Sequence, residues 1–385
     1  MIVDLHAHYP MHLLPPGPGG TLGQMRSRQW KAHWRARTVR VISRFANYEG
    51  PGGQPGVTVP LMRTGDARVV LSMLYSPLDE IDLSKGYGEP PESEYFHNLI
   101  DQLDVVEQEI SARHAGQAVV AHSAAGLDAA IAAGQVALIH AVEGGHALGA
   151  TEAEIKQNVA ELRHRGVAYV TLAHLFWRRV ATNAPALPFM PDWLYKLVFR
   201  QPGSEGLSDL GRAAVRAMHD NKVLIDVTHM STASLKDTFD LLGQIDPQKQ
   251  TPVIASHMAC RCGRKGPEYN TGDDTIREIK ARGGVMGVIA CRHWATVNLG
   301  KDRTFADSVD RICAHIDRIH DVTGSHEYAA IGSDLDGYIK PALKGIEHMG
   351  RMRRLEAELV ARYGPADAKL ICSDNALRVL RGYWG

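Results

Sequence analysis

The chain of 385 residues carries 43 Lys and Arg against 43 Asp and Glu, so its formal net charge at pH 7 is zero. This balance gives no electrostatic case for nucleic acid or an anionic membrane surface as a partner, and we expect neither. Five cysteines without a repeated spacing argue against a disulfide framework and indicate a reducing compartment, so the cytoplasm is the expected location.

Eight short apolar runs recur along the chain. They span 2–8, 68–76, 136–145, 167–174, 223–230, 252–258, 284–291 and 329–337. Near-continuous apolar runs are typical of strands buried on both faces of a parallel sheet. The amphipathic stretches between them span 93–114, 123–133, 151–165, 208–221, 231–242, 273–282 and 304–321. Eight strands alternating with helices predict an α/β fold, the (β/α)8 TIM barrel.

Helix starts support this pattern. Thr151 with Glu154 has the form of a capping box, and Ser208 and Ser231 stand where N-caps are expected. An open doubly wound sheet is the alternative. Such a sheet normally has fewer strands and a Gly-rich phosphate turn after the first one, and no GxGxxG follows the first run here.

We expect residues 1–385 to form a single TIM-barrel domain with two long loop insertions, at 9–67 and 175–207. The first contains the stretches PPGPGG and GPGGQPG, and the second is rich in aromatic residues and proline. Long insertions in compact domains often form lids or binding loops. Both leave the C-terminal ends of strands, where barrel active sites are built.

The first run ends in His-x-His. His6 and His8 are two residues apart on a strand, so their side chains point the same way, and Asp4 is expected on that face too. Neutral imidazole is a good zinc ligand, which makes the pair a ready two-point chelate. The pair alone is a modest signal, because most such pairs are ordinary surface or core residues.

Residues of metal-ligand type also end several later runs. They are Glu143, His174, His229, His257 and Asp334. In a barrel these strand ends converge on one mouth. A buried carboxylate at Glu143 needs a cation, because an unpaired buried charge is very costly. The pattern predicts a metal centre, although Asp334 could instead cap a turn.

These motifs resemble those of the membrane (renal-type) dipeptidase family, peptidase family M19 of the amidohydrolase superfamily. The matching segments come in the family's order and cover nearly the whole chain. They are VEGGHALG (142–149), GLSDLGRAAVRAMHDNKVLIDVTHMS (206–231), TPVIASHM (251–258), AAIGSDLDGY (329–338) and SDNALRVLRGYWG (373–385).

The resemblance implies two divalent metal ions, with zinc as the expected metal. His6 and His8 would bind the first ion, Glu143 would bridge the two, and His229 with His257 would bind the second. Asp334 would lie near the first ion and carry the proton of the attacking water. His174 would polarise the substrate carbonyl.

The chain departs from the family pattern twice. Its first motif is His-x-His where the family usually has His-x-Asp, which removes one negative charge from the site. Family dipeptidases also hold the substrate carboxylate with an arginine after the sixth strand, whereas Tyr269 stands at that position here. Arg261, Arg264 and Arg292 are the nearby candidates for this role.

The sequence therefore predicts a metallo-dipeptidase-like hydrolase that cleaves dipeptides, including those with a C-terminal D-residue, through a metal-bridging hydroxide. The resemblance also suggests a homodimer. One alternative is an amidohydrolase-superfamily enzyme acting on another amide, a lactam or an ester, which the missing carboxylate clamp favours. A more remote alternative is a non-catalytic metal-binding scaffold. Such a scaffold would be expected to lose metal ligands. Among the expected ligand positions, only the first motif departs from the family pattern here.

Overall fold

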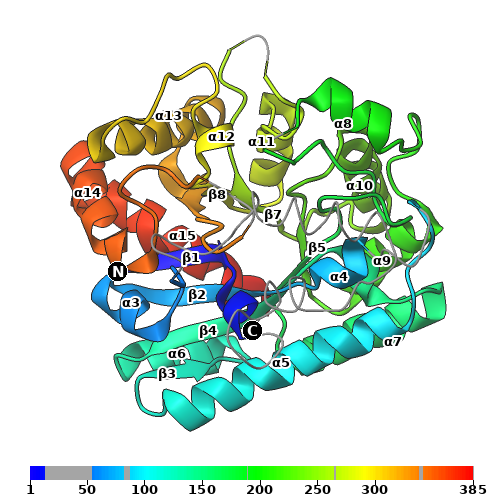
Figure 1. The fold of residues 1–385 in the computed structure, drawn as a ribbon, viewed down its shortest axis with the longest axis horizontal. Coiled ribbons are helices and arrows are strands. Elements are labelled where there is room, and N and C mark those ends of the chain that lie inside the picture. Colours follow the sequence, from blue (N-terminus) through cyan, green and yellow to red (C-terminus); the bar gives the residue numbers. More distant parts are fainter. Residues whose placement is uncertain (14–53, 82–86, 189, 264–265, 338–340, 385) are drawn as a thin grey trace, which may run out of the picture.

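The computed structural model describes residues 1–13, 54–81, 87–188, 190–263, 266–337 and 341–384. Parallel strands form its centre and helices surround them (Figure 1). The strands are β1 (Ile2–Ala7), β2 (Ala67–Leu74), β3 (Ala118–Val120), β4 (Val136–Glu143), β5 (Tyr169–Thr171), β6 (Leu224–Asp226), β7 (Val253–Met258), β8 (Met286–Val288) and β9 (Ala329–Ile331).

Eight of these strands close into a barrel. The sheet runs β2-β1-β9-β8-β7-β6-β5-β4, and pairing of β2 with β4 joins its two ends. This confirms the predicted (β/α)8 TIM barrel. The ninth strand, β3, was not predicted; it pairs with the first half of β4, while the end of β4 pairs with β5. Strand β3 lies in an apolar run of only four residues, 118–121, which is shorter than the eight runs that predicted strands.

Each predicted amphipathic stretch coincides with a helix, and the other helices were not predicted. The helices lie outside the strands (Figure 1). They are α3 (Val59–Thr64), α4 (Pro77–Ile81), α5 (Glu94–Arg113), α6 (Ala124–Ala132), α7 (Glu152–His164), α8 (Asp192–Val198), α9 (Asp209–Asp220), α10 (Thr232–Ile245), α11 (Asp273–Ala281), α12 (Arg292–Ala295), α13 (Phe305–Thr323), α14 (Met352–Lys369) and α15 (Asn375–Val379). Short 3₁₀ turns are η1 (Tyr9–His12), η3 (Gly145–Leu148), η4 (His326–Tyr328) and η5 (Met349–Arg351), and π turns are η6 (Leu370–Asp374) and η7 (Leu380–Trp384).

Local capping chemistry explains where several helices begin. Thr151 and Glu154 form the reciprocal capping box of α7. The side chains of Ser208 and Ser231 accept backbone hydrogen bonds at the starts of α9 and α10. Each of these bonds satisfies an amide that would otherwise lack a partner in the first helical turn.

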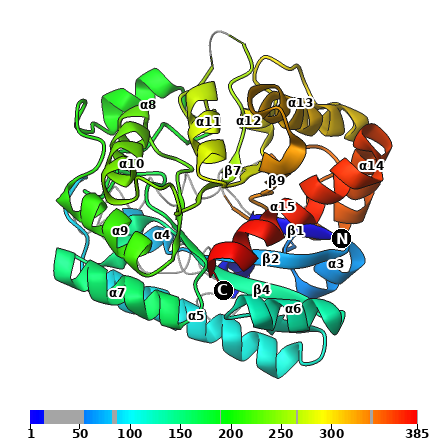
Figure 2. The same ribbon diagram turned by 180° about the vertical axis from the view of Figure 1, so that it is seen from behind.

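The buried apolar side chains form two clusters, and the smaller one lies inside the barrel. Apolar side chains from strands all around the barrel form one cluster, which therefore fills the interior; Leu71, Ile139 and Ile254 belong to it. The C-terminal segment lies across the end of the barrel seen in Figure 2, and Trp384 joins the same cluster. The Trp384 indole donates to the Gly166 carbonyl oxygen at 3.1 Å, just before β5. This end of the barrel is packed, so a site belongs at the other end.

Both predicted insertions leave that other end. Of 9–67, the structure describes η1 and the segment that contains α3, and residues 14–53 lie outside the described residues. Within 175–207 it describes α8. Whether residues 1–385 form a single domain stays a prediction.

One buried carboxylate, Asp336, contacts the two segments of the first insertion that flank residues 14–53. Its Oδ1 accepts from the Gly56 amide at 2.9 Å and its Oδ2 from the Val57 amide at 2.7 Å. The Nε2 atom of His12 lies 3.0 Å from Oδ2. The described segments around His12 and Val57 therefore meet at one point, in the turn that follows β9.

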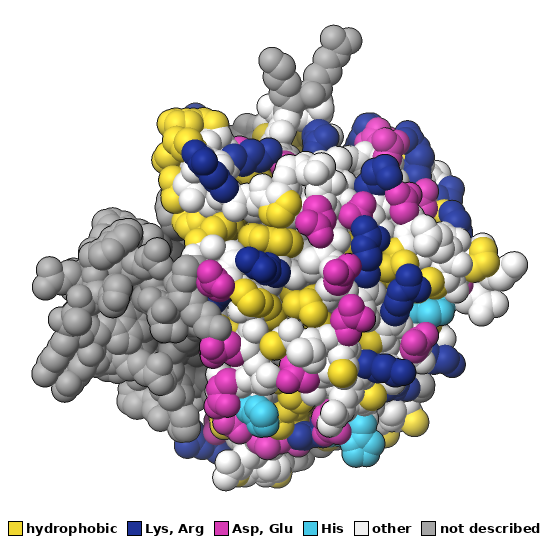
Figure 3. All heavy atoms as spheres, turned by 90° about the vertical axis from the view of Figure 1, so that its right-hand side faces the viewer, with side chains coloured by type: hydrophobic (Ala, Val, Ile, Leu, Met, Phe, Trp, Pro, Cys, Tyr) yellow, Lys and Arg dark blue, Asp and Glu magenta, His cyan; other side chains and the backbone are white. Residues whose placement is uncertain are grey.

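The visible surface mixes acidic and basic side chains, as the balanced composition requires (Figure 3). None of the helices in the described ranges is both long and apolar enough to cross a membrane.

Candidate metal centre

The predicted ligands come together at the C-terminal ends of the barrel strands. Each is at most 8% exposed. They are His6 and His8 at the end of β1, Glu143 as the last residue of β4, His229 after β6, His257 in β7 and Asp334 after β9. Three sets of ligand atoms lie close enough to hold an ion: His6, His8 and Glu143; Glu143, His229 and His257; and His6, His257 and Asp334.

Glu143 stands at the centre of this cluster. Its Oε1 lies 3.3 Å from His6 Nε2 and 3.6 Å from the Nε2 atoms of both His229 and His257. Its Oε2 lies 3.4 Å from His8 Nε2. One carboxylate thus lies within 3.6 Å of both histidine pairs, the arrangement expected of a ligand shared by two ions.

The chemistry of these atoms fits divalent cations. Both Glu143 oxygens are buried and make no hydrogen bond among the described residues, while five imidazole nitrogens lie within 3.6 Å of them. A buried carboxylate needs compensation of its charge, and one surrounded by ligand-type nitrogens is suited to share a cation with them. His229 Nε2 and His257 Nε2 point at one another across 2.9 Å. Burial lowers the pKa of both imidazoles, and for His257 the nearby His6 and His229 lower it further. Neutral imidazole is the form that binds metal.

Asp334 completes the first histidine pair. Its Oδ1 lies 3.1 Å from His8 Nε2 and 3.9 Å from His6 Nε2. Its backbone is left-handed, with φ +56°, which aims the side chain back at the cluster. A Cβ at Gly337 would come within 2.1 Å of Asp334 Oδ1 and 2.8 Å of the His8 ring, so only glycine leaves room for this approach.

Asp4 lies beside the ligands but belongs to none of the three ligand sets. The pairing register of β1 shifts between Asp4 and Ala7. The Asp4 carboxylate instead accepts from the amides of His6 (3.1 Å) and Ser333 (2.9 Å). It fixes the backbone of the metal-site strands, and burial raises its pKa to about 6.

A polar network that the sequence did not reveal orients the ligands from behind. Ser256 Oγ lies 2.9 Å from His257 Nδ1 and 3.1 Å from His6 Nδ1, and it donates to Asp226 Oδ2 at 2.5 Å. The Tyr169 hydroxyl lies 2.9 Å from His6 Nδ1. Such partners set which ring nitrogen faces a metal. Asp226 is the last residue of β6 and directly precedes the Val-Thr-His segment that ends in His229, and this position was the one sequence signal for the network.

His174 lies beside the cluster, with its Nε2 3.3 Å from Glu143 Oε2. Its Nδ1 meets Glu80 Oε2 at 2.8 Å. Burial lowers the pKa of His174, but the charges of Glu143 and Glu80 outweigh burial and raise it to about 9. Sequence reasoning missed Glu80, because an acidic residue in a short helix is usually on the surface.

The residues proposed to bind substrate have different surroundings. The Tyr269 hydroxyl donates to the His257 carbonyl oxygen at 3.1 Å, and the ring stacks on Trp294 at 4.5 Å. Arg292 pairs with Asp302 at 2.7 Å. Arg264 lies outside the described residues. Tyr269 and Arg292 therefore already have partners, which leaves Arg261 as the described candidate.

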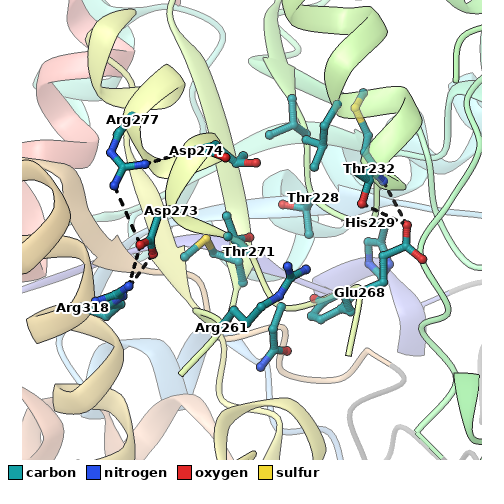
Figure 4. A pocket seen from close by; sticks show the side chains of 18 of the residues that line it. Thr228, His229, Thr232, Arg261, Glu268, Thr271, Asp273, Asp274, Arg277 and Arg318 are labelled. Atoms are coloured by element: carbon teal, nitrogen blue, oxygen red, sulfur yellow. Dashed lines mark hydrogen bonds and ion pairs between the residues drawn. The ribbon is translucent and has the colours of Figure 1, made fainter. Parts of the chain in front are cut away.

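Arg261 extends into a cavity of about 400 Å³ between α10 and α11 (Figure 4). The other arginines lining this cavity are paired: Arg318 with Asp273 at 2.6 Å, and Arg277 with Asp274 at 2.7 Å. Among the described residues the Arg261 side chain has no ion pair or hydrogen bond, and its Nε is buried. His229 and Tyr269 line the same cavity, so it abuts the metal cluster.

Comparisons with known proteins agree with this geometry. The model of a family described as membrane dipeptidase (peptidase family M19) matches residues 45–383. Dipeptidase 3 of Mus musculus is 29% identical over 259 residues, which cover 64% of this chain and 44% of that protein. The chain thus spans less than half the length of this curated relative.

Two solved structures share the fold at 18% identity. One is a dipeptidase described as a metallo peptidase of family M19, with a TM-score of 0.70 and coverage of 100% of this chain and 98% of that one. The other is a metallo peptidase from Rhodobacter sphaeroides, bound to a phosphinate mimic of the dipeptide L-Ala-D-Ala. Its TM-score is 0.66, with coverage of 100% and 99%.

Proposed function

Because the chain belongs to the membrane dipeptidase family, peptidase family M19, we propose that it is a binuclear metal-dependent hydrolase that cleaves the peptide bond of dipeptides. The observation that carries this proposal is the position of Glu143. Its carboxylate is shared by two of the candidate ligand sets, and neither of its buried oxygens makes a hydrogen bond among the described residues.

In this proposal His6, His8 and Asp334 hold one ion with Glu143, and His229 with His257 hold the other. Imidazole-rich ligand sets suit zinc, which we propose as the metal. Two such ions would lower the pKa of a water molecule between them and polarise the scissile carbonyl.

The protein's own groups then complete the reaction. His174 Nε2 faces the cluster and donates to the oxygen of the carbonyl under attack, which stabilises the charge that develops there. Asp334 takes the proton of the attacking water and delivers it to the leaving nitrogen. The peptide C–N bond breaks, and the two amino acids leave as the products.

We propose that the substrates include dipeptides with a D-residue at the C-terminal side. The Rhodobacter sphaeroides relative was solved with a mimic of L-Ala-D-Ala, which supports this choice. Arg261 is the cation that we assign to the substrate carboxylate, because it lacks a partner among the described residues and shares a cavity with His229. A carboxylate paired with guanidinium makes two parallel hydrogen bonds.

A second candidate function is hydrolysis of another amide, a lactam or an ester. The observation that favours it is Tyr269, whose hydroxyl is already bonded to the His257 carbonyl oxygen and whose side chain carries no positive charge.

A substrate panel separates the two candidates. Zinc-reconstituted protein and a chelated control are assayed on L,L- and L,D-dipeptides, their C-terminal amides, an N-acyl amino acid, a lactam and a lactone. We expect metal-dependent release of amino acids from the dipeptides. Arg261→Met should raise KM for free-acid dipeptides but not for their amides, and Arg292→Met, the matched control, should change neither. Turnover of the lactam or lactone with silence on every dipeptide would favour the second candidate.

We also propose a cytoplasmic location, which rests on five cysteines that are all free. Cell fractionation checks it, and recovery of the protein with membranes or in the medium would contradict it. The homodimer stays a prediction.

A further inference from the structure

His174 is held from the side opposite the metal cluster by a buried carboxylate. Glu80 Oε2 lies 2.8 Å from His174 Nδ1, while His174 Nε2 lies 3.3 Å from Glu143 Oε2. A carboxylate can only accept at this distance, so the proton of the contact belongs to Nδ1. Nε2 is then the nitrogen that faces the reaction site.

Glu80 is itself fixed by groups from two separate segments. Its Oε2 also accepts from the Tyr75 hydroxyl at 2.6 Å, and its Oε1 accepts from the Phe176 amide at 2.9 Å. Tyr75 follows β2, whereas His174 and Phe176 follow β5. The side chain is only 1% exposed. These contacts in a buried place leave the carboxylate a single position.

The His174 ring is also packed edge-on between two aromatic rings. The ring centroid of Tyr75 lies 4.6 Å away and that of His229 lies 4.7 Å away. Turning the imidazole over would replace Nδ1 by a ring carbon opposite Glu80 and leave the carboxylate short of a donor. The hydrogen bond and the packing therefore select the same orientation.

We infer that Glu80 is a positioning residue for catalysis, which holds His174 with Nε2 toward the substrate carbonyl. This inference rests on the proposed function, in which His174 stabilises the carbonyl oxygen. The negative charge of Glu80 also balances the positive charge that the ring carries whenever both nitrogens are protonated. A buried aspartate does the same for the histidine of a serine protease.

A spectroscopic test needs no substrate. Zinc-reconstituted protein labelled with ¹⁵N-histidine should show a downfield imidazole proton on Nδ1, assigned by its loss in His174→Ala. We expect Glu80→Ala to remove or strongly shift this signal. Asp79→Asn, which removes the neighbouring charge on α4 where Asp79 bonds Asn98 at 3.0 Å, should leave it unchanged. An unaltered signal in Glu80→Ala would overturn the inference.

Kinetics supply the second readout. Glu80→Gln keeps the volume of the side chain, so it also serves if the alanine variant is unstable. We expect kcat to fall about 10- to 100-fold, with KM and zinc content near those of the wild type. Unchanged kcat, or a fall that follows loss of zinc, would overturn the inference. If the wild type cleaves no substrate in the panel, the proposed function fails while the resonance still tests the role of Glu80.

Discussion

Replacing Glu143 by glutamine should weaken the binding of both metal ions at once. Glu143 belongs to the ligand set with His6 and His8 and to the set with His229 and His257. It lies 3.3–3.6 Å from these four imidazoles, and it is the residue that these two sets have in common. Glutamine keeps the shape of the side chain but removes the charge, so each set loses its anionic bridge.

The size of the effect follows from binding linkage. At a free metal concentration of 1,000 times Kd, each site stabilises the folded state by about 4 kcal/mol, and two sites by about 8 kcal/mol. Loss of an outer partner of a ligand weakens binding by up to about 100-fold, so we take about 100-fold as a lower bound for losing a direct ligand. At the same metal concentration, the stabilisation of the folded state by each site then falls to about 1.4 kcal/mol or less.

The corresponding change in Tm can be measured. With an unfolding entropy of about 2.1 cal/mol/K per residue, a chain of 385 residues changes its Tm by roughly 1.2 °C per kcal/mol. We therefore expect zinc to raise the Tm of the wild type by about 10 °C over the chelated form, and that of the variant by about 3–4 °C. Comparing each variant with its own chelated form cancels any change in the metal-free protein.

The assay is scanning calorimetry combined with metal analysis of dialysed samples. The wild type should retain about two ions per chain. Glu143→Gln should retain fewer and lose turnover in parallel. Two retained ions in the variant, with a zinc-dependent rise in Tm equal to that of the wild type, would refute the bridging role.

The remaining predictions concern single groups. His174→Ala should lower kcat by about 10²–10⁴-fold while both ions stay bound, because its Nε2 acts on the substrate and not as a ligand; loss of metal on analysis would reassign it. Asp334→Asn should abolish turnover of dipeptides with at least one ion retained, and a fully active variant would exclude it as the proton carrier. Away from the site, burial raises the pKa of Asp246, but hydrogen bonds from the Thr251 and Gln250 amides and from Arg282 outweigh burial and hold the pKa below its usual value. A lowered folded-state pKa means that the stabilisation is present above the unfolded pKa of about 3.9 and disappears as pH falls through the folded value. Asp246→Asn should therefore cost about 3–5 kcal/mol in the free energy of unfolding at pH 7, and the difference in denaturant titrations should shrink below pH 4; a difference independent of pH would contradict this.

Local pattern was enough to predict most of the barrel. The apolar runs match its eight strands because strands buried on both faces carry few polar residues. The ends of those runs also located the ligands, since the C-terminal ends of barrel strands meet at one mouth. Glu143 is the clearest case, because a carboxylate buried at the end of an apolar run requires a cation to balance its charge.

The groups that orient the ligands could not be predicted in this way. Glu80 is 94 residues from His174, and Ser256 is 250 residues from His6, so no local spacing connects either pair. Asp4 accepts from the Ser333 amide, 329 residues away, so its contact with the β9 turn could not be predicted from local spacing either. Strand β3 lies in an apolar run of only four residues, 118–121, which is shorter than the runs that predicted the other strands.

The contacts of Asp336 fix the two segments that flank residues 14–53 at one place. Because the segments at His12 and Val57 meet on a single carboxylate, the chain between them starts and finishes at the same place whatever its length. Lengthening a connection with fixed ends costs little entropy, since each doubling adds only about 0.6 kcal/mol. Relatives could therefore join these two segments by chains of different length without moving the strands that carry His6 and Asp334.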